Sequence, residues 1–188
     1  MKVLWTANLI PANLSAKLNM TSEVLGGWVE SMAGKLSSYE NIELAIACKC
    51  DENITFSEKL DGVRYYSLGY SQSTDSENLV SACLKIIDDF SPDIVHIEGT
   101  EFLHSKAMLS AAKEKNIPAV VSMQGILNGY YNYQCGELPV DDMMFSKSLT
   151  NIFSAWILHL RKTRWFKPRM KSEKEIIENA DYILGRTT

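Results

Sequence analysis

Apolar residues in the first half of the chain fall into short runs that alternate with stretches of helical spacing. The runs at 2–7, 42–47 and 63–68 are bounded by polar or turn residues, which predicts buried strands. Apolar positions in 28–36 and 78–90 recur every three or four residues, which predicts helices that bury one face. The chain therefore begins as alternating strands and helices.

The same alternation continues toward the C-terminus. We expect a strand at 93–97, a helix at 102–115, a strand at 119–123 and a last strand at 182–184. Strands separated by helices of this length pair in parallel through right-handed crossovers. We predict an α/β fold, namely a Rossmann-like three-layer α/β/α domain with a mainly parallel sheet.

Two stretches break the alternation. Polar residues between the first strand and the first helix predict a loop, and residues 125–150 have no clear period and contain several glycines. A loop as long as the second one is uncommon unless it has a function. Beyond it we expect two helices, at 149–161 and 170–179.

Composition indicates one domain that spans residues 1–188. Apolar residues make up 46% of the chain and charged residues 22%, which is enough for a core, and the net charge of −4 argues against a nucleic-acid partner. The four cysteines form no C-x-x-C pair and are too few for a disulfide scaffold. No apolar run approaches the ~18 residues of a spanning helix. We expect a soluble cytoplasmic protein with reduced thiols.

The carboxyl ends of the predicted strands are the expected ligand edge, because open parallel sheets bind ligands there. This rule selects residues 8–14, 98–101, 124–128 and 185–188. The chain stops directly after its last predicted strand, so we expect a second domain to follow in the full-length protein.

His96 and Glu98 lie two positions apart on a predicted strand and therefore share one face. Together with His104 they resemble part of a metal site, but the sequence offers no firm third ligand and no P-C-x-x-C partner motif. We predict no bound metal. A polar role at the strand end and a structural, hydrogen-bonded histidine both remain open.

Gly26 and Gly27 directly precede a predicted helix. Paired glycines let backbone N–H groups approach an anion, and a helix N-terminus favours negative charge, so a diphosphate would fit. On spacing alone, an ordinary loop-to-helix turn is the simpler explanation of the pair. The sequence has no P-loop, G-x-G-x-x-G or G-x-S-x-G motif.

A basic segment spans residues 159–171. Six of the 19 basic residues lie in this segment, which contains no acidic residue. The rest of the chain has 13 basic residues and all 23 acidic residues. The six are Arg161, Lys162, Arg164, Lys167, Arg169 and Lys171. Trp156, Trp165 and Phe166 accompany them, and this combination suits an anionic membrane surface. The alternative is a solvated helix whose aromatic residues pack on the core.

Several segments, in order, resemble the N-terminal domain of family-4-type glycosyltransferases of the GT-B fold. They are KVLWTANLIP, GGWVESMAGKL, SPDIVHIEGTEF, NIPAVVSMQGILNGYY and EKEIIENADYILGRTT. The resemblance covers nearly the whole chain and implies a two-domain enzyme in which this domain holds mainly the acceptor. The second domain, with its paired glutamates, has no counterpart here, so we expect the isolated chain to be catalytically silent.

The resemblance also implies roles for individual residues. Gly26 and Gly27 correspond to the loop near the donor diphosphate. Gln124 occupies a position where many family members have a histidine, and glutamine cannot act as a general acid or base. The implied acceptor or cleft contacts are His96, Glu98, Gly125 and Asn128, with the loop at 125–136.

The implied activity is transfer of a hexose, with retention, from a nucleotide sugar to a glycan or lipid-linked acceptor. The nucleotide sugar is a substrate, and no cofactor is expected. We expect the enzyme in the cytoplasm, with peripheral contact to the inner face of the membrane. Two alternatives stay open: a non-catalytic α/β binding module that is complete at Thr188, and half of another GT-B enzyme such as a nucleotide-sugar epimerase.

Overall fold

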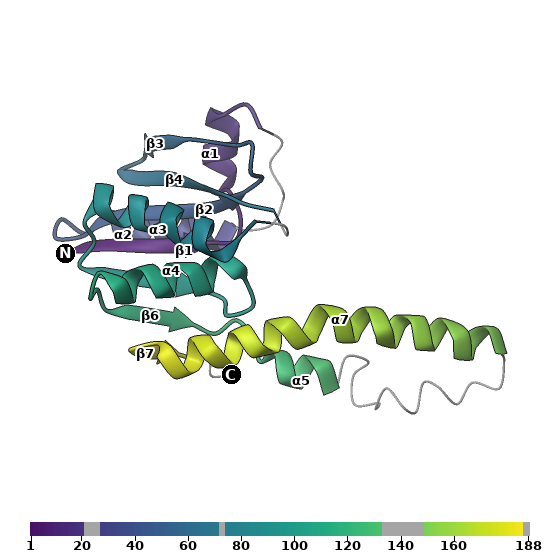
Figure 1. Cartoon of the computed structure of the whole chain (residues 1–188). Helices are drawn as coiled ribbons and strands as arrows, with labels where there is room; N and C mark the ends of the chain where they lie inside the picture. The colour runs from purple at the N-terminus through teal and green to yellow at the C-terminus, as the bar shows by residue number, and fades with distance from the viewer. Residues whose placement is uncertain (21–26, 72–73, 133–148, 186–188) are drawn as a thin grey trace.

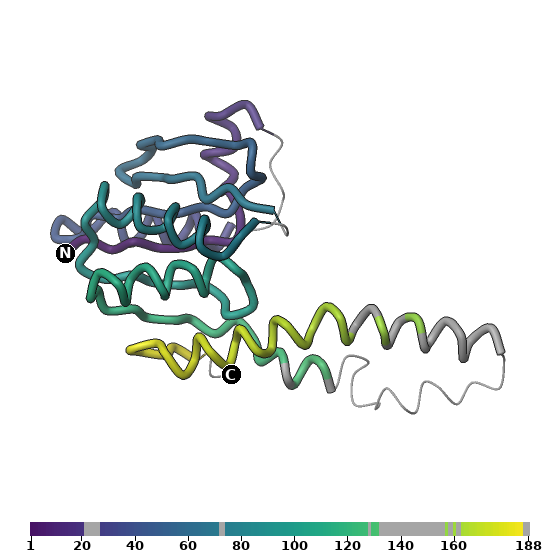
Figure 2. The backbone as a smooth tube through the Cα atoms, viewed as in Figure 1, coloured from purple at the N-terminus to yellow at the C-terminus, as the bar shows by residue number. Residues whose placement is uncertain are grey.

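The computed structural model describes residues 1–20, 27–71, 74–132 and 149–185; Figure 2 draws all other residues in grey, together with a few inside helices whose side chains are not described. The strands are β1 (Lys2–Ala7), β2 (Glu43–Cys50), β3 (Ser57–Leu60), β4 (Val63–Gly69), β5 (Ile94–Glu98), β6 (Ala119–Ser122) and β7 (Tyr182–Leu184). The helices are α1 (Ala12–Lys17), α2 (Gly27–Ser37), α3 (Ser76–Phe90), α4 (Leu103–Glu114), α5 (Leu127–Asn132) and α7 (Leu149–Asn179).

The strands form one seven-stranded sheet in the order β3-β4-β2-β1-β5-β6-β7. Every neighbouring pair is parallel except β3 and β4, which form an antiparallel hairpin. The turn of this hairpin places Asp61 and Gly62 at positive φ, the conformation that suits a tight hairpin. The predicted α/β fold with a mainly parallel sheet is confirmed.

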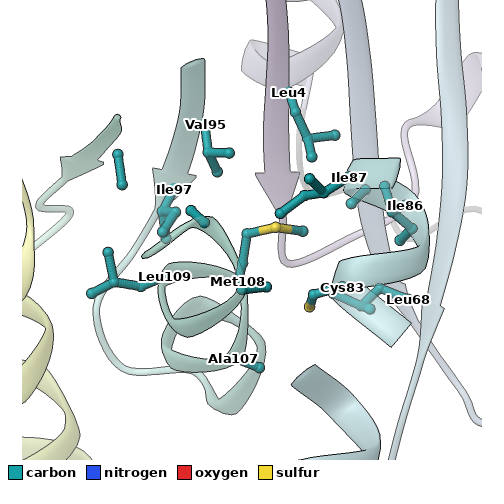
Figure 3. Packing of buried hydrophobic residues seen from close by; sticks show 14 of the residues in the cluster. Leu4, Leu68, Cys83, Ile86, Ile87, Val95, Ile97, Ala107, Met108 and Leu109 are labelled. Atoms are coloured by element: carbon teal, nitrogen blue, oxygen red, sulfur yellow. The ribbon is translucent and has the colours of Figure 1, made fainter. Parts of the chain in front are cut away.

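Helices cover both faces of the sheet (Figure 1). On one face, α3, α4 and the C-terminal half of α7 pack on alternate residues of the strands; Figure 3 shows Leu4, Val95 and Ile97 of that face against Ile87 and Met108 of the helices. The intervening strand residues face α1 and α2 in a second apolar cluster. Because successive side chains alternate between faces, the central strands β1, β2, β4 and β5 each contribute to both clusters.

Two aspartates fix where neighbouring parallel strands begin. Asp93 accepts a hydrogen bond from the N–H of Lys2 at 2.6 Å, and its own N–H donates to the Lys2 carbonyl at 2.8 Å. Asp181 does the same with Ala119, at 2.8 and 3.1 Å. Each aspartate directly precedes its strand, so this pair of bonds sets the register of β5 on β1 and of β7 on β6.

Three expected loops or breaks are wrong. Helix α1 lies in the first predicted loop, because Leu14 is fully buried against the sheet. Helix α5 lies in the second one, and residues 133–148 fall outside the description. The two helices predicted at 149–161 and 170–179 are one continuous helix, α7, with Pro168 inside it. Phe166 and Ile176 are buried on either side of the proline, and this packing offsets the missing backbone hydrogen bond.

The N-terminal half of α7 extends away from the sheet, past the carboxyl ends of the strands, with α5 beside the helix (Figure 1). Among the described residues, no helix combines the length and apolar character needed to cross a bilayer. Cys48, Cys50 and Cys83 are free, buried thiols, and burial raises the pKa of Cys83 to about 12. Cys135 lies outside the described residues.

Candidate functional site

The sequence-predicted residues His96, Glu98 and Gln124 form one polar cluster, called here the edge cluster. His96 and Glu98 are on β5, and Gln124 follows β6, which pairs in parallel with β5. The Glu98 carboxylate lies between the other two: His96 Nε2 is 3.6 Å from its Oε1, and Gln124 Nε2 donates to its Oε2 at 3.4 Å. The parallel pairing thus joins residues that the sequence separates.

Burial keeps His96 neutral. Its ring lies 5.1 Å from the ring of Trp5 on β1, and its Nε2 is 2.7 Å from Ser122 Oγ on β6. Burial lowers the pKa of His96 to about 4. At neutral pH the ring is therefore a hydrogen-bonding group and carries no positive charge toward Glu98.

Backbone contacts fix the strand ends that carry the edge cluster. The N–H of Glu98 donates to Thr6 Oγ at 3.4 Å, and the N–H of Gly99 donates to the Ser122 carbonyl at 3.0 Å. Gly99 has a φ of +81°, a backbone conformation that is strained for residues with a side chain. A Cβ added there would lie 3.0 Å from the Glu101 carboxylate. Glycine at this position lets the chain turn sharply after Glu98.

Gly27 is the first residue of α2, and this helix packs on the sheet face that carries Trp5. Alternation along β5 places His96 and Glu98 on that same face. Among the residues that the structure describes, nothing lies within 4 Å of a Cβ added at Gly27. Gly26 lies outside the described residues.

The remaining predicted contacts lie around α5. Gly125 follows Gln124, and a Cβ there would overlap the ring of Tyr130, an exposed side chain that has room to move. Asn128 belongs to α5, but its side chain and the rest of the predicted contact loop, residues 133–136, lie outside the description. The structure therefore leaves the Asn128 contact as a prediction.

His104 lies apart from the edge cluster. It is fully buried on α4, with its Nδ1 2.9 Å from the Tyr70 hydroxyl, and burial lowers its pKa to about 3. Its ring stacks on Phe102 at 5.2 Å. Within the described part of the chain, no three His, Cys, Asp or Glu side chains gather in a way that could hold a metal ion.

The two described aromatic residues of the basic segment differ in their surroundings, and each fits a different interpretation of the segment. Phe166 is buried, 6.0 Å from the ring of Tyr131 on α5, as expected for core packing. Trp165 is 45% exposed, and the Arg169 guanidinium lies 4.1 Å above its ring. The side chains of Arg161, Lys162 and Trp156 lie outside the description.

Sequence reasoning missed three residues that support the edge cluster: Thr6, Ser122 and Glu173. Thr6 and Ser122 are small polar residues near the ends of apolar strands, a signal that the pattern did contain. Glu173 is buried on α7, at helical spacing from the buried Phe166 and Ile176. A carboxylate on the apolar face of a helix is the signal that could have identified it.

The described cavities lie elsewhere. A groove of about 480 Å³ runs between α3 and α4, lined by residues such as Leu79, Leu84 and Leu103, and no member of the edge cluster lines it.

No family model matches this sequence, and no curated protein matches it either. Solved structures do: MnaA from S. aureus in complex with UDP has a TM-score of 0.53 at 12% identity, and the match covers 98% of this chain and 37% of that chain. A putative UDP-N-acetylglucosamine 2-epimerase from Listeria monocytogenes gives 0.52 at 12% identity, covering 98% and 38%. Sucrose-phosphate synthase from Thermosynechococcus elongatus gives 0.53 at 12% identity, covering 97% and 41%.

The chain thus spans about two fifths of the length of these proteins. At this identity the likeness shows the fold. It confirms the Rossmann-like domain of GT-B type that the sequence predicts, and family-4 membership stays a prediction.

Proposed function

We propose that this chain is the acceptor-side half of a glycosyltransferase that moves a hexose from a nucleotide sugar to a glycan or lipid-linked acceptor. The edge cluster carries the proposal: a buried carboxylate between a neutral imidazole and an amide, at the carboxyl edge of a parallel sheet. Carboxylates and amides are suitable partners for sugar hydroxyl groups. The donor-binding half would belong to a second domain.

The donor diphosphate would lie at the N-terminus of α2. Backbone N–H groups at the helix N-terminus point there, and the helix dipole favours a negative charge. Gly27 lets the diphosphate approach the backbone closely. Among the described residues none lies within 4 Å of a Cβ added at Gly27, so a larger side chain there would reach the proposed ligand position without a clash at its Cβ with any of them.

This assignment is tested by Gly27→Leu in the full-length protein, with Gly34→Leu as the matched control. Gly34 lies on the same helix and also has nothing within 4 Å of an added Cβ. We expect Gly27→Leu to lower kcat/KM for the nucleotide sugar at least tenfold and Gly34→Leu to change it less than twofold. Equal kcat/KM in both variants would contradict the assignment of the diphosphate to this position.

A nucleotide-sugar epimerase is the second candidate, because one of the similar folds is that of a putative UDP-N-acetylglucosamine 2-epimerase. Full-length protein incubated with a UDP-sugar separates the two activities. An epimerase forms the epimeric sugar nucleotide without any acceptor, whereas a transferase releases UDP and extends an added acceptor. Absence of both reactions, together with no binding of the UDP-sugar, would favour the non-catalytic binding module.

We also propose that α7 meets an anionic membrane. Ile157, Leu160, Arg164, Lys167 and Lys171 recur every three or four residues and are exposed, so they form one stripe opposite the buried Phe166. This stripe, called here the α7 stripe, is apolar toward the projecting end and basic toward the sheet. Such a surface binds anionic headgroups through its charges and the acyl boundary through its apolar residues.

Co-sedimentation with phosphatidylglycerol vesicles tests the α7 stripe. We expect binding at low salt that is released at high salt, because a Debye length of about 10 Å at 0.1 M screens the attraction. The double variant Lys167→Glu/Lys171→Glu should lose binding, while Lys85→Glu on α3, an exposed lysine away from the stripe, should keep it. If the same amount of protein stays in the supernatant with and without vesicles, the basic side chains of the α7 stripe are solvated and do not bind a membrane.

A further inference from the structure

A buried carboxylate on α7 is not explained by packing. Glu173 is 5% exposed on the helix face that also buries Phe166 and Ile176. An apolar residue would fill this position at lower cost, because a buried carboxylate needs hydrogen-bond donors to offset its lost hydration. The donors that Glu173 uses therefore indicate what the residue does.

Both donors come from loops next to the edge cluster. Thr100 Oγ donates to Glu173 Oε2 at 2.9 Å. The backbone N–H of Leu127 lies 3.2 Å from Oε1 and 3.3 Å from Oε2 of the same carboxylate. One side chain thus joins α7 to the loop after β5 and to the start of α5.

These loops carry the proposed site. Thr100 is two residues after Glu98, and Leu127 is three residues after Gln124. The positive φ at Gly99 gives the first loop a sharp turn, and a fully buried Thr100 ends that turn. The distance between the Glu98 and Gln124 side chains therefore depends on two backbone segments that Glu173 holds together.

We propose that Glu173 is a positioning residue: it holds Glu98 and Gln124 at the separation that the substrate requires. This inference rests on the proposed function of the edge cluster. Without the carboxylate, the Leu127 N–H and the Thr100 hydroxyl lose their partner, and both loops gain freedom. Misplacement by about 1 Å is enough to cost about 100-fold in rate at an active site.

Glu173→Ala and Glu173→Gln in the full-length protein test the inference, with Glu178→Ala as the control. Glu178 lies on the same helix but is exposed, and its partner is Lys174 at 3.7 Å. Glutamine can accept from the Leu127 N–H with its oxygen and donate to Thr100 Oγ with its NH₂ group. We therefore expect the glutamine variant to retain most of the function.

Two readouts separate positioning from folding. By hydrogen exchange, Glu173→Ala should speed exchange of the peptide containing Leu127 at least tenfold and leave the β2 peptide containing the buried Ile46 unchanged. By kinetics, kcat should fall at least tenfold while KM for the nucleotide sugar changes less than twofold. Glu178→Ala should match the wild type in both.

The outcomes distinguish failure of the inference from failure of the proposed function. Equal acceleration of exchange in both peptides, or an unchanged Leu127 peptide, would overturn the positioning role. An unchanged kcat in Glu173→Ala would also overturn it. A wild-type protein that turns over no nucleotide sugar would overturn the proposed function, and with it the inference, even where exchange shows that Glu173 holds the two loops.

Discussion

His96 offers a test of the edge cluster that needs no substrate. Its ring is buried between Trp5 and Ser122, and this burial lowers the pKa from 6.5 to about 4. In the unfolded chain the imidazole regains its ordinary pKa. Between pH 6.5 and pH 4 the unfolded chain therefore binds more protons than the folded one, and the free energy of unfolding falls as the pH falls through this window.

The size of the effect follows from these two pKa values. From pH 7 to pH 5, a histidine that titrates at 6.5 when unfolded and near 4 when folded removes about 2 kcal/mol from the free energy of unfolding. His96→Gln removes this titration and keeps a polar partner for Ser122. We expect the variant to lose about 2 kcal/mol less stability than the wild type over the same interval.

Urea unfolding at pH 7 and pH 5 measures the difference, and NMR titration of the His96 ring measures its pKa directly. His104, whose pKa is also lowered by burial, is present in both proteins, so its contribution cancels in the comparison. An identical loss of stability in wild type and variant would refute the reasoning. So would a titration midpoint near 6.5, because it would mean that water reaches the ring.

Three further substitutions test the fold around the site by urea unfolding. Asp181→Ala should cost about 1–2 kcal/mol, because the Ala119 N–H loses a charged acceptor; no change would mean that this bond does not set the register of β7. Gly99→Ala should cost about 1 kcal/mol or more through strain at positive φ, and an unchanged stability would show that the turn relaxes freely. Met108→Ala should cost about 2–5 kcal/mol by opening a cavity in the larger core cluster, and a loss below 1 kcal/mol would contradict its full burial there.

The central strands of the sheet were predictable because they are buried on both faces. Such strands appear as short apolar runs, and the helices between them bury only one face, so the two kinds of element differ in period. The helix α1 was missed because six residues are too few to show a period. Its single fully buried leucine, Leu14, has no counterpart one turn later that is equally buried.

The continuous helix α7 was missed for a different reason. Proline usually ends a helix, and Pro168 lies in the middle of this one. Local preference is outweighed by tertiary contacts here, because Phe166 packs on Tyr131 and Ile176 lies in the core. Those partners are distant in sequence, so no local pattern could reveal them.

The members of the edge cluster were predictable, but their arrangement was not. The rule for parallel sheets selects the strand ends, and the polar residues there are visible in the sequence. Which of them touch depends on the order of the strands, and β5 and β6 happen to be neighbours. The link through Glu173 is more remote still, since it joins Thr100 to a residue 73 positions away.

We expect the residues of the edge cluster to suit transfer better than epimerisation. Epimerisation at a carbon centre breaks and remakes a bond to hydrogen, which requires groups that accept and return a proton. Burial lowers the pKa of His96 to about 4, so its ring is neutral near pH 7, and the Gln124 amide does not titrate, which leaves Glu98 as the one carboxyl group of the cluster. One carboxylate can receive the proton of an acceptor hydroxyl, whereas the paired proton transfers of an epimerase would need a second group from another part of the protein. We therefore predict acceptor-dependent release of UDP by the full-length protein, and formation of the epimeric sugar nucleotide without an acceptor would contradict this prediction.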